Sequence, residues 1–119
     1  MIERIHPYVG TPDPKASADF YTTLFALEIA MKSPVLGLRA PGNPAAQLLL
    51  LPPDPETPTP HLGIDVGDPT QVDAAYHAAL RHESKIVYPL TSEPWSVRRF
   101  FVEDPTGTII NVLAHNPPR

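Results

Sequence analysis

The chain has no cysteine, only six glycines, no basic block and no long hydrophobic run. The lack of cysteine excludes disulfides, thiolate metal sites and cysteine catalysis. The net charge is −4 and the sequence has no basic cluster, so it lacks the positive surface that binding to nucleic acid or to an anionic membrane requires. The longest leucine run, residues 48–51, is far too short to span a bilayer, and the N-terminus lacks an apolar signal region. We therefore expect a soluble, cytoplasmic protein.

What remains is the composition of a single globular domain. Its 119 residues suffice for one hydrophobic core but not for two independent ones. Proline is abundant at 17 residues, and it is concentrated in the segment PPDPETPTP at residues 52–60. This segment cannot form a helix or an interior strand, and it favours extended polyproline geometry. We interpret it as a linker between two halves rather than as a proline-rich recognition motif.

A short pattern occurs twice, at an offset of 55 positions. In each copy a histidine on a predicted strand is followed by an Asp-Pro pair and then by a tyrosine: His6, Asp13-Pro14 and Tyr21, then His61, Asp68-Pro69 and Tyr76. Aspartate caps the free N–H groups of a first helical turn, and proline is well tolerated at the first helical position. Several matches at one offset favour a repeated strand-helix unit over coincidence.

The predicted elements follow the order β-α-β-β-β twice, which defines an α+β fold with a pseudo-twofold repeat. Helices are predicted over residues 14–26 and 70–82 from apolar residues at helical spacing: Phe20, Leu24 and Leu27, then Val72, Ala75, Tyr76, Ala79 and Leu80. Strands are predicted at residues 2–10, 29–32, 36–40, 46–51, 61–66, 85–88, 97–103 and 108–114. Module 1 covers about residues 1–51 and module 2 about residues 61–119 of a single domain.

Two groups of residues carry a resemblance to a known family. In the second half they are His61, Trp95 and the run RRFFVEDPTG at residues 98–107; in the first half they are His6, Asp13, Ser17 and Phe20-Tyr21. In these features the chain resembles the vicinal oxygen chelate superfamily of glyoxalase I, bleomycin-resistance proteins and extradiol dioxygenases. The resemblance implies two βαβββ modules whose curved sheets enclose a cavity. It does not define a reaction, because this superfamily hosts many chemistries and some plain binders.

Metal-dependent members of the superfamily place ligands on the first and last strand of each module. Carried over by position, these places are His6, Gln47, His61 and Asn111. The set contains no glutamate, and two imidazoles with two amides would leave the charge of a divalent cation uncompensated. We therefore expect no tightly bound metal and no other cofactor. The alternative is a metal-dependent lyase, isomerase or dioxygenase with His6 and His61 as metal ligands.

The favoured prediction is a small-molecule-binding protein whose cavity is lined by the same four residues and by Tyr8, which shares a strand face with His6. For Gln47 and Asn111 the alternative is a local role as buried amides that satisfy backbone groups. With no phosphate cradle and no basic cluster, the lining suits a planar or aromatic ligand with a few polar edges.

Two further residues are assigned to the ligand. Trp95, the single tryptophan, precedes the last hairpin, where an indole either stacks on a planar ligand or anchors the loop at the cavity mouth. Arg98 and Arg99 alternate strand faces, so only one can reach the cavity and clamp a carboxylate. Arg98 is the arginine we assign. A homodimer is also expected, because relatives complete the cavity across two modules within one chain or between partners. A third hypothesis is a structural or regulatory dimer with an empty groove.

Overall fold

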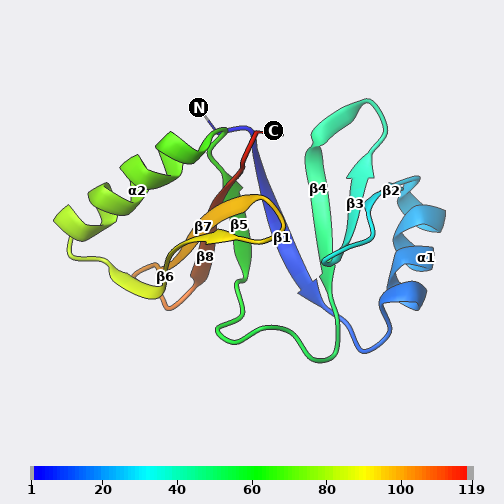
Figure 1. Ribbon diagram of the computed structural model, residues 1–119. Helices are drawn as coiled ribbons and strands as arrows, with labels where there is room; N and C mark the ends of the chain where they lie inside the picture. The colour runs from blue at the N-terminus through cyan, green and yellow to red at the C-terminus, as the bar shows by residue number, and fades with distance from the viewer. Residues whose placement is uncertain (1, 118–119) are drawn as a thin grey trace.

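The computed structural model describes residues 2–117 and contains the predicted βαβββ order twice (Figure 1). The first module consists of β1 (Arg4–Gly10), α1 (Pro14–Phe25), β2 (Glu28–Met31), β3 (Leu36–Ala40) and β4 (Asn43–Leu51). The second consists of β5 (Leu62–Asp65), α2 (Pro69–Arg81), β6 (Lys85–Glu93), β7 (Val97–Glu103) and β8 (Ile109–His115). Neither helix is long and apolar enough to cross a membrane.

All eight strands belong to one sheet, in the order β2-β3-β4-β1-β5-β8-β7-β6. Within each module the first strand pairs in parallel with the last, β1 with β4 and β5 with β8. The two modules meet where β1 pairs antiparallel with β5. This arrangement relates the modules by a pseudo-twofold at the centre of the sheet, and the helices lie at its two ends (Figure 1).

Both helices begin as their Asp-Pro pairs predict. The Asp13 carboxylate accepts the Ala16 N–H at 3.1 Å, and the Asp68 carboxylate accepts the Gln71 N–H at 3.1 Å. Each proline occupies the first turn, where its missing N–H leaves no hydrogen bond unmade. The repeated motif is therefore a pair of equivalent helix starts.

The predicted apolar stripe of α2 packs on the second half of the sheet. Val72 is fully buried against Phe100, Val112 and Ala114 of β7 and β8, and the remaining contacts come from Ala75, Tyr76 and Ala79. Leu80 departs from the prediction, because it is half-exposed near the helix end.

Of the three residues predicted to form the buried stripe of α1, only Leu27 packs in the core. Ala18 is the buried residue of this helix, and it packs with Tyr21 and Leu27 on the first half of the sheet. Phe20 and Leu24 are 49% and 58% exposed. At about 100° per residue Phe20 lies roughly 200° around the helix from Ala18, so the helix can bury only one of the two faces. The small side chain of alanine lets the helix lie close to the strands.

Two strands are longer than predicted. β4 begins at Asn43 rather than at residue 46, which shortens the preceding turn, and β6 continues past residue 88 to Glu93. Pro89 is the reason that the sequence pattern ended β6 early, since proline cannot donate to a sheet ladder. β6 is an edge strand, and on its open side a missing backbone N–H leaves no neighbouring strand without a hydrogen bond.

A close approach joins the two modules at the centre of the sheet. His6 of β1 is the register partner of Gly63 of β5, and its imidazole lies directly over the glycine. A Cβ at position 63 would lie 2.1 Å from His6 Nε2, far inside van der Waals contact. Only glycine leaves room for this ring on this face of the sheet.

The substitution Gly63→Ala is therefore expected to lower the free energy of unfolding by about 1–3 kcal/mol, because the imidazole is only 3% exposed and must be displaced. Urea denaturation would measure the change. Gly10→Ala in β1 is the matched control, since a Cβ there meets nothing within 4 Å. Adding His6→Ala to Gly63→Ala should remove most of the loss that Gly63→Ala causes, and equal losses with and without the imidazole would contradict the overlap.

Candidate functional site

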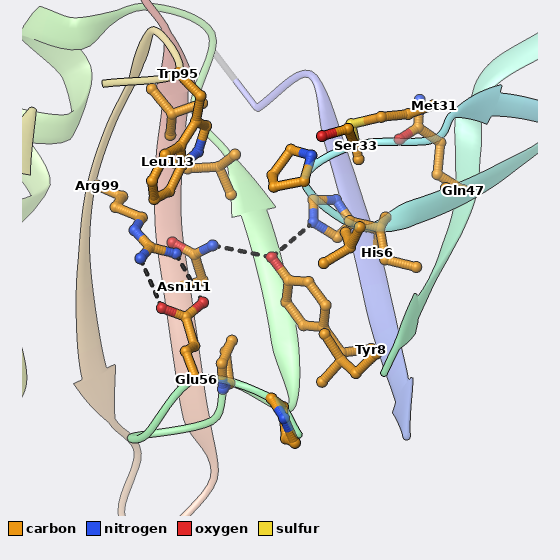
Figure 2. Close-up of a pocket in the computed structure, with 18 of the residues that line it drawn as sticks. His6, Tyr8, Met31, Ser33, Gln47, Glu56, Trp95, Arg99, Asn111 and Leu113 are labelled. Atoms are coloured by element: carbon orange, nitrogen blue, oxygen red, sulfur yellow. Dashed lines mark hydrogen bonds and ion pairs between the residues drawn. The ribbon is translucent and has the colours of Figure 1, made fainter. Parts of the chain in front are cut away.

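A cavity of about 570 Å³ lies between the two modules (Figure 2). The cavity and α2 lie on opposite faces of the sheet, because side chains alternate along each strand. Val112 and Ala114 of β8 pack against α2, whereas Asn111 and Leu113 line the cavity. The lining comes from strands β1 to β4, β7 and β8, from the β2–β3 loop and the β6–β7 turn, and from the linker. A single chain therefore supplies walls from both modules.

Three polar side chains from two strands, β1 and β8, form a hydrogen-bonded chain in the cavity wall. Asn111 Nδ2 donates to the Tyr8 hydroxyl at 2.9 Å, and His6 Nε2 lies 3.3 Å from the same hydroxyl (Figure 2). The Tyr8 hydroxyl accepts from Asn111, and the tautomer of the His6 imidazole sets whether it donates to His6 Nε2 or accepts from it.

This chain leaves two buried polar atoms without a partner among residues 2–117. They are His6 Nδ1 and Asn111 Oδ1. Buried polar atoms are nearly always paired, and each unpaired one costs about 1–3 kcal/mol. The two atoms therefore reduce the stability of the fold by an amount of this order.

Burial also sets the protonation of the same residues. Desolvation, followed by the nearby positive charge of Arg4, lowers the pKa of His6 to about 4, so this imidazole is neutral at neutral pH. Burial raises the pKa of Tyr8, although its hydrogen bond from Asn111 opposes the rise. The phenol is thus protonated at neutral pH and able to donate a hydrogen bond.

Arg99 of β7 also lines the cavity, and its guanidinium lies between two carboxylates. Its Nε donates to Glu93 Oε2 at 2.6 Å, and its two Nη atoms donate to the two oxygens of Glu56 at 3.0 and 2.7 Å. Burial alone would lower the pKa of Arg99, but the hydrogen bonds and charges of Glu56 and Glu93 outweigh it and raise the pKa. The guanidinium is therefore permanently charged.

Aromatic rings surround this guanidinium. The Arg99 Cζ atom lies 5.0 Å from the ring centre of Tyr88, 5.3 Å from that of Trp95 and 4.8 Å from that of Phe101. Trp95 is half-exposed in the β6–β7 turn, where Ser96 adopts a left-handed backbone with φ of 64°. The indole thus stands at the rim of the cavity and next to its buried cation.

Five of the predicted ligand-binding residues line the cavity: His6, Tyr8, Gln47, Trp95 and Asn111. Gln47 borders the cavity, but its Nε2 donates to the Pro44 carbonyl at 3.0 Å. The local role weighed for this amide is therefore what its side chain performs in the structure. Asn111, in contrast, uses its amide within the cavity wall.

His61 is a correction to the predicted lining. It lies exposed in the bend before β5, and its Nδ1 accepts the Ile109 N–H at 3.0 Å at the start of β8. Regular strand alternation begins only at Leu62, so nothing holds the imidazole to the cavity side. The β5 residue opposite His6 is Gly63, which has no side chain to offer.

Arg98 is the second correction, because Arg99 takes its place. Arg98 Nε donates to Asp73 of α2 at 2.6 Å, so its side chain lies on the helix-covered face of the sheet. The alternation of the two arginines is confirmed, but the assignment of Arg98 to the cavity is wrong, since Arg99 lines it. Glu56 was missed altogether, since a carboxylate within a proline-rich linker carries no sequence signal of a site.

The four positions that relatives use for a metal make other contacts in this structure. His61 is outside the cavity, Gln47 bonds to its own turn, and His6 and Asn111 both bond to Tyr8. Within residues 2–117 no group of three or more histidine, aspartate or glutamate side chains is placed to hold a metal ion. That no metal binds tightly stays a prediction.

The chain belongs to the Glyoxalase/Bleomycin resistance protein/Dioxygenase superfamily, whose family model matches residues 4–112. No curated protein matches this chain.

Several solved structures share its fold. A Legionella pneumophila structure described as an NAD-dependent benzaldehyde dehydrogenase is similar at 19% identity with a TM-score of 0.76, over 94% of this chain and 99% of that one. Methylmalonyl-CoA epimerase from Mycobacterium tuberculosis is similar at 18% identity with a TM-score of 0.76, over 94% and 87%. The Streptomyces coelicolor epimerase, bound to 2-nitronate-propionyl-CoA, is similar at 17% identity with a TM-score of 0.72, over 98% and 100%. At these identities the likeness establishes the fold alone.

The pKa of His6 predicts a pH dependence of stability. An unfolded histidine titrates near 6.5 and the folded one near 4, so between these values the unfolded chain binds a proton that the folded chain does not. His6 should therefore reduce stability progressively as the pH falls from 6.5 to 4, by about 3 kcal/mol in total. Urea denaturation across this range would measure it. His6→Gln should have a shallower slope than wild type, whereas His77→Gln, on the exposed side of α2, should keep the wild-type slope.

Proposed function

We propose that this protein binds a small planar or aromatic organic molecule in the cavity between its modules, without a catalytic metal. The hydrogen-bonded chain of His6, Tyr8 and Asn111 is the observation that carries the proposal. It lies in a wall with apolar neighbours such as Leu49 and Leu113. A cavity of about 570 Å³ with a few converging polar groups has the size and character of a small-molecule site.

The protonation of the polar groups favours binding over proton transfer. A histidine with a pKa of about 4 is a weak base at neutral pH, and a buried tyrosine with a raised pKa is a weak acid. Both are suited to donating and accepting hydrogen bonds in fixed directions. The Streptomyces coelicolor epimerase, in complex with a CoA derivative, supports the use of this fold for a small organic ligand.

Aromatic compounds that enter the cavity should change the fluorescence of Trp95, the single indole of the chain, which stands at the rim. Asn111→Ala removes one end of the hydrogen-bonded chain and should weaken binding about tenfold, the equivalent of one hydrogen bond of ~1.4 kcal/mol. Fluorescence titration of folded variants would measure this. His61→Ala is the matched control, because His61 lies outside the cavity, and its affinity should equal that of wild type.

Ligands that bind equally well to wild type, Asn111→Ala and Gln47→Ala would place the site elsewhere. Near-stoichiometric metal in untagged protein, lost on His6→Ala, would replace the proposal with the metal-dependent enzyme.

We also propose that two copies associate through an exposed apolar face of α1, formed by Phe20, Leu24 and Phe25. Phe20 and Phe25 lie 6.2 Å apart between ring centres, and all three side chains are about half-exposed. Together they present on the order of 300 Å² of apolar surface, comparable to the largest apolar patch of a typical monomer, which is often functional. A second copy is the occupant that supplies the same face, because a twofold interface pairs one patch with itself.

Leu24→Glu should convert the dimer to monomer at micromolar concentration, because it places a charge at the centre of this face. Sedimentation velocity would measure the change. Leu80→Glu on α2, at a similarly half-exposed leucine, should leave the dimer intact. A wild-type chain that sediments only as monomer at micromolar concentration would contradict the association.

A further inference from the structure

We propose that the ligand of this cavity has a carboxylate, and that Arg99 binds it by releasing Glu56 of the linker. The inference rests on the proposed function and specifies its ligand class. Arg99 is the cavity arginine whose paired Nη groups are held by a residue from a segment without helix or strand. The structure thus offers a bidentate carboxylate site whose present partner is replaceable.

The two carboxylates on Arg99 differ in how firmly they are held. The side chain of Glu93 is 8% exposed and also accepts the Tyr88 hydroxyl at 2.8 Å, so it is a fixed part of the wall. The side chain of Glu56 is 45% exposed, and within residues 2–117 its carboxylate hydrogen-bonds only to Arg99. Glu93 therefore positions the guanidinium, and Glu56 occupies the face that Arg99 presents to the cavity.

Exchange of Glu56 for a ligand carboxylate leaves no charge buried and unpaired. Glu56 already bonds the Arg99 fork through both oxygens at 3.0 and 2.7 Å, which shows that a planar carboxylate fits there. A ligand carboxylate would meet the same two N–H groups, and the half-exposed Glu56 would return to water. The number of carboxylates on Arg99 stays the same, so the exchange requires no additional cation.

The other cavity arginines are not suited to this role. Arg4 pairs at 2.5 Å with Asp65, which is buried and also accepts the Gly67 N–H. Arg39 pairs with Glu28 at the exposed surface of β2 and β3. Displacement of Asp65 would leave a buried carboxylate unpaired, and Arg39 is partly screened by water.

The neighbours of Arg99 define the rest of the ligand. Trp95 stands beside Arg99 on one wall, and Asn111 lies between Arg99 and Tyr8 (Figure 2). A carboxylate held by Arg99 would bring an attached planar ring against the indole and its polar substituents toward Asn111. The ligand class is therefore an aromatic or planar carboxylic acid.

The experiment compares matched pairs of planar ligands, such as naphthoates and the corresponding naphthamides, by titration calorimetry at pH 7.5 and fixed ionic strength. Glu56→Gln removes the competing carboxylate, so naphthoate affinity should rise at least tenfold while naphthamide affinity changes less than twofold. Arg99→Lys keeps the charge but loses the planar fork, and it should weaken naphthoate at least tenfold. Glu103→Gln, which changes the net charge equally by unpairing Lys85 away from the cavity, should leave both affinities unchanged.

The outcomes separate this inference from the proposed function. If naphthamides bind and Glu56→Gln leaves the ratio of naphthoate to naphthamide affinity unchanged, the carboxylate assignment is overturned and the cavity remains a binding site. If Glu103→Gln raises naphthoate affinity as much as Glu56→Gln does, the effect is one of net charge, and the assignment is equally overturned. If no ligand of either type binds wild type or Glu56→Gln, the proposal of an aromatic ligand fails as well.

Discussion

The antiparallel pairing of β1 with β5 is the interaction on which the rest of the molecule depends. Without it each module would end in an unpaired strand, and neither would enclose a cavity. The pairing places His6 over Gly63 and brings Tyr8 within reach of Asn111, which is 103 positions away in the sequence. Because a glycine stands at this contact, the central strands can carry a bulky imidazole on their cavity side.

Strand alternation then divides the sheet into two faces with different tasks. One face buries Phe100 and Val112 against α2, where apolar packing supplies stability. The other face carries Arg99 and Asn111 into the cavity, where their polar groups must find partners. Most are satisfied within residues 2–117, but His6 Nδ1 and Asn111 Oδ1 are not. This wall is therefore less favourable for stability than an apolar core would be.

The linker contributes more to the cavity than its composition indicates. It connects β4 to β5, and in doing so it carries Glu56 to the cavity wall, where the carboxylate meets Arg99. A residue of the linker thereby becomes the partner of the cavity's most buried arginine. In the proposed exchange, release of Glu56 and binding of a ligand carboxylate are coupled through this one ion pair.

The sequence by itself determined the features that depend on local chemistry. The Asp-Pro pairs specified both helix starts, and the two-residue strand period placed His6 and Tyr8 on a common face. The family motif also specified the paired βαβββ architecture. These predictions succeeded because caps and periodicity act over a few neighbouring residues.

Only the tertiary structure decided which face of an element is buried and which residues meet across the chain. Periodicity shows that Arg98 and Arg99 alternate, but the position of α2 decides that Arg98 bonds to Asp73 and that Arg99 faces the cavity. The site of His61 depends on where β5 begins, and the buried face of α1 depends on how closely Ala18 can approach the sheet. Each of these outcomes is set by packing between segments far apart in the sequence, and the local sequence pattern does not predict such contacts.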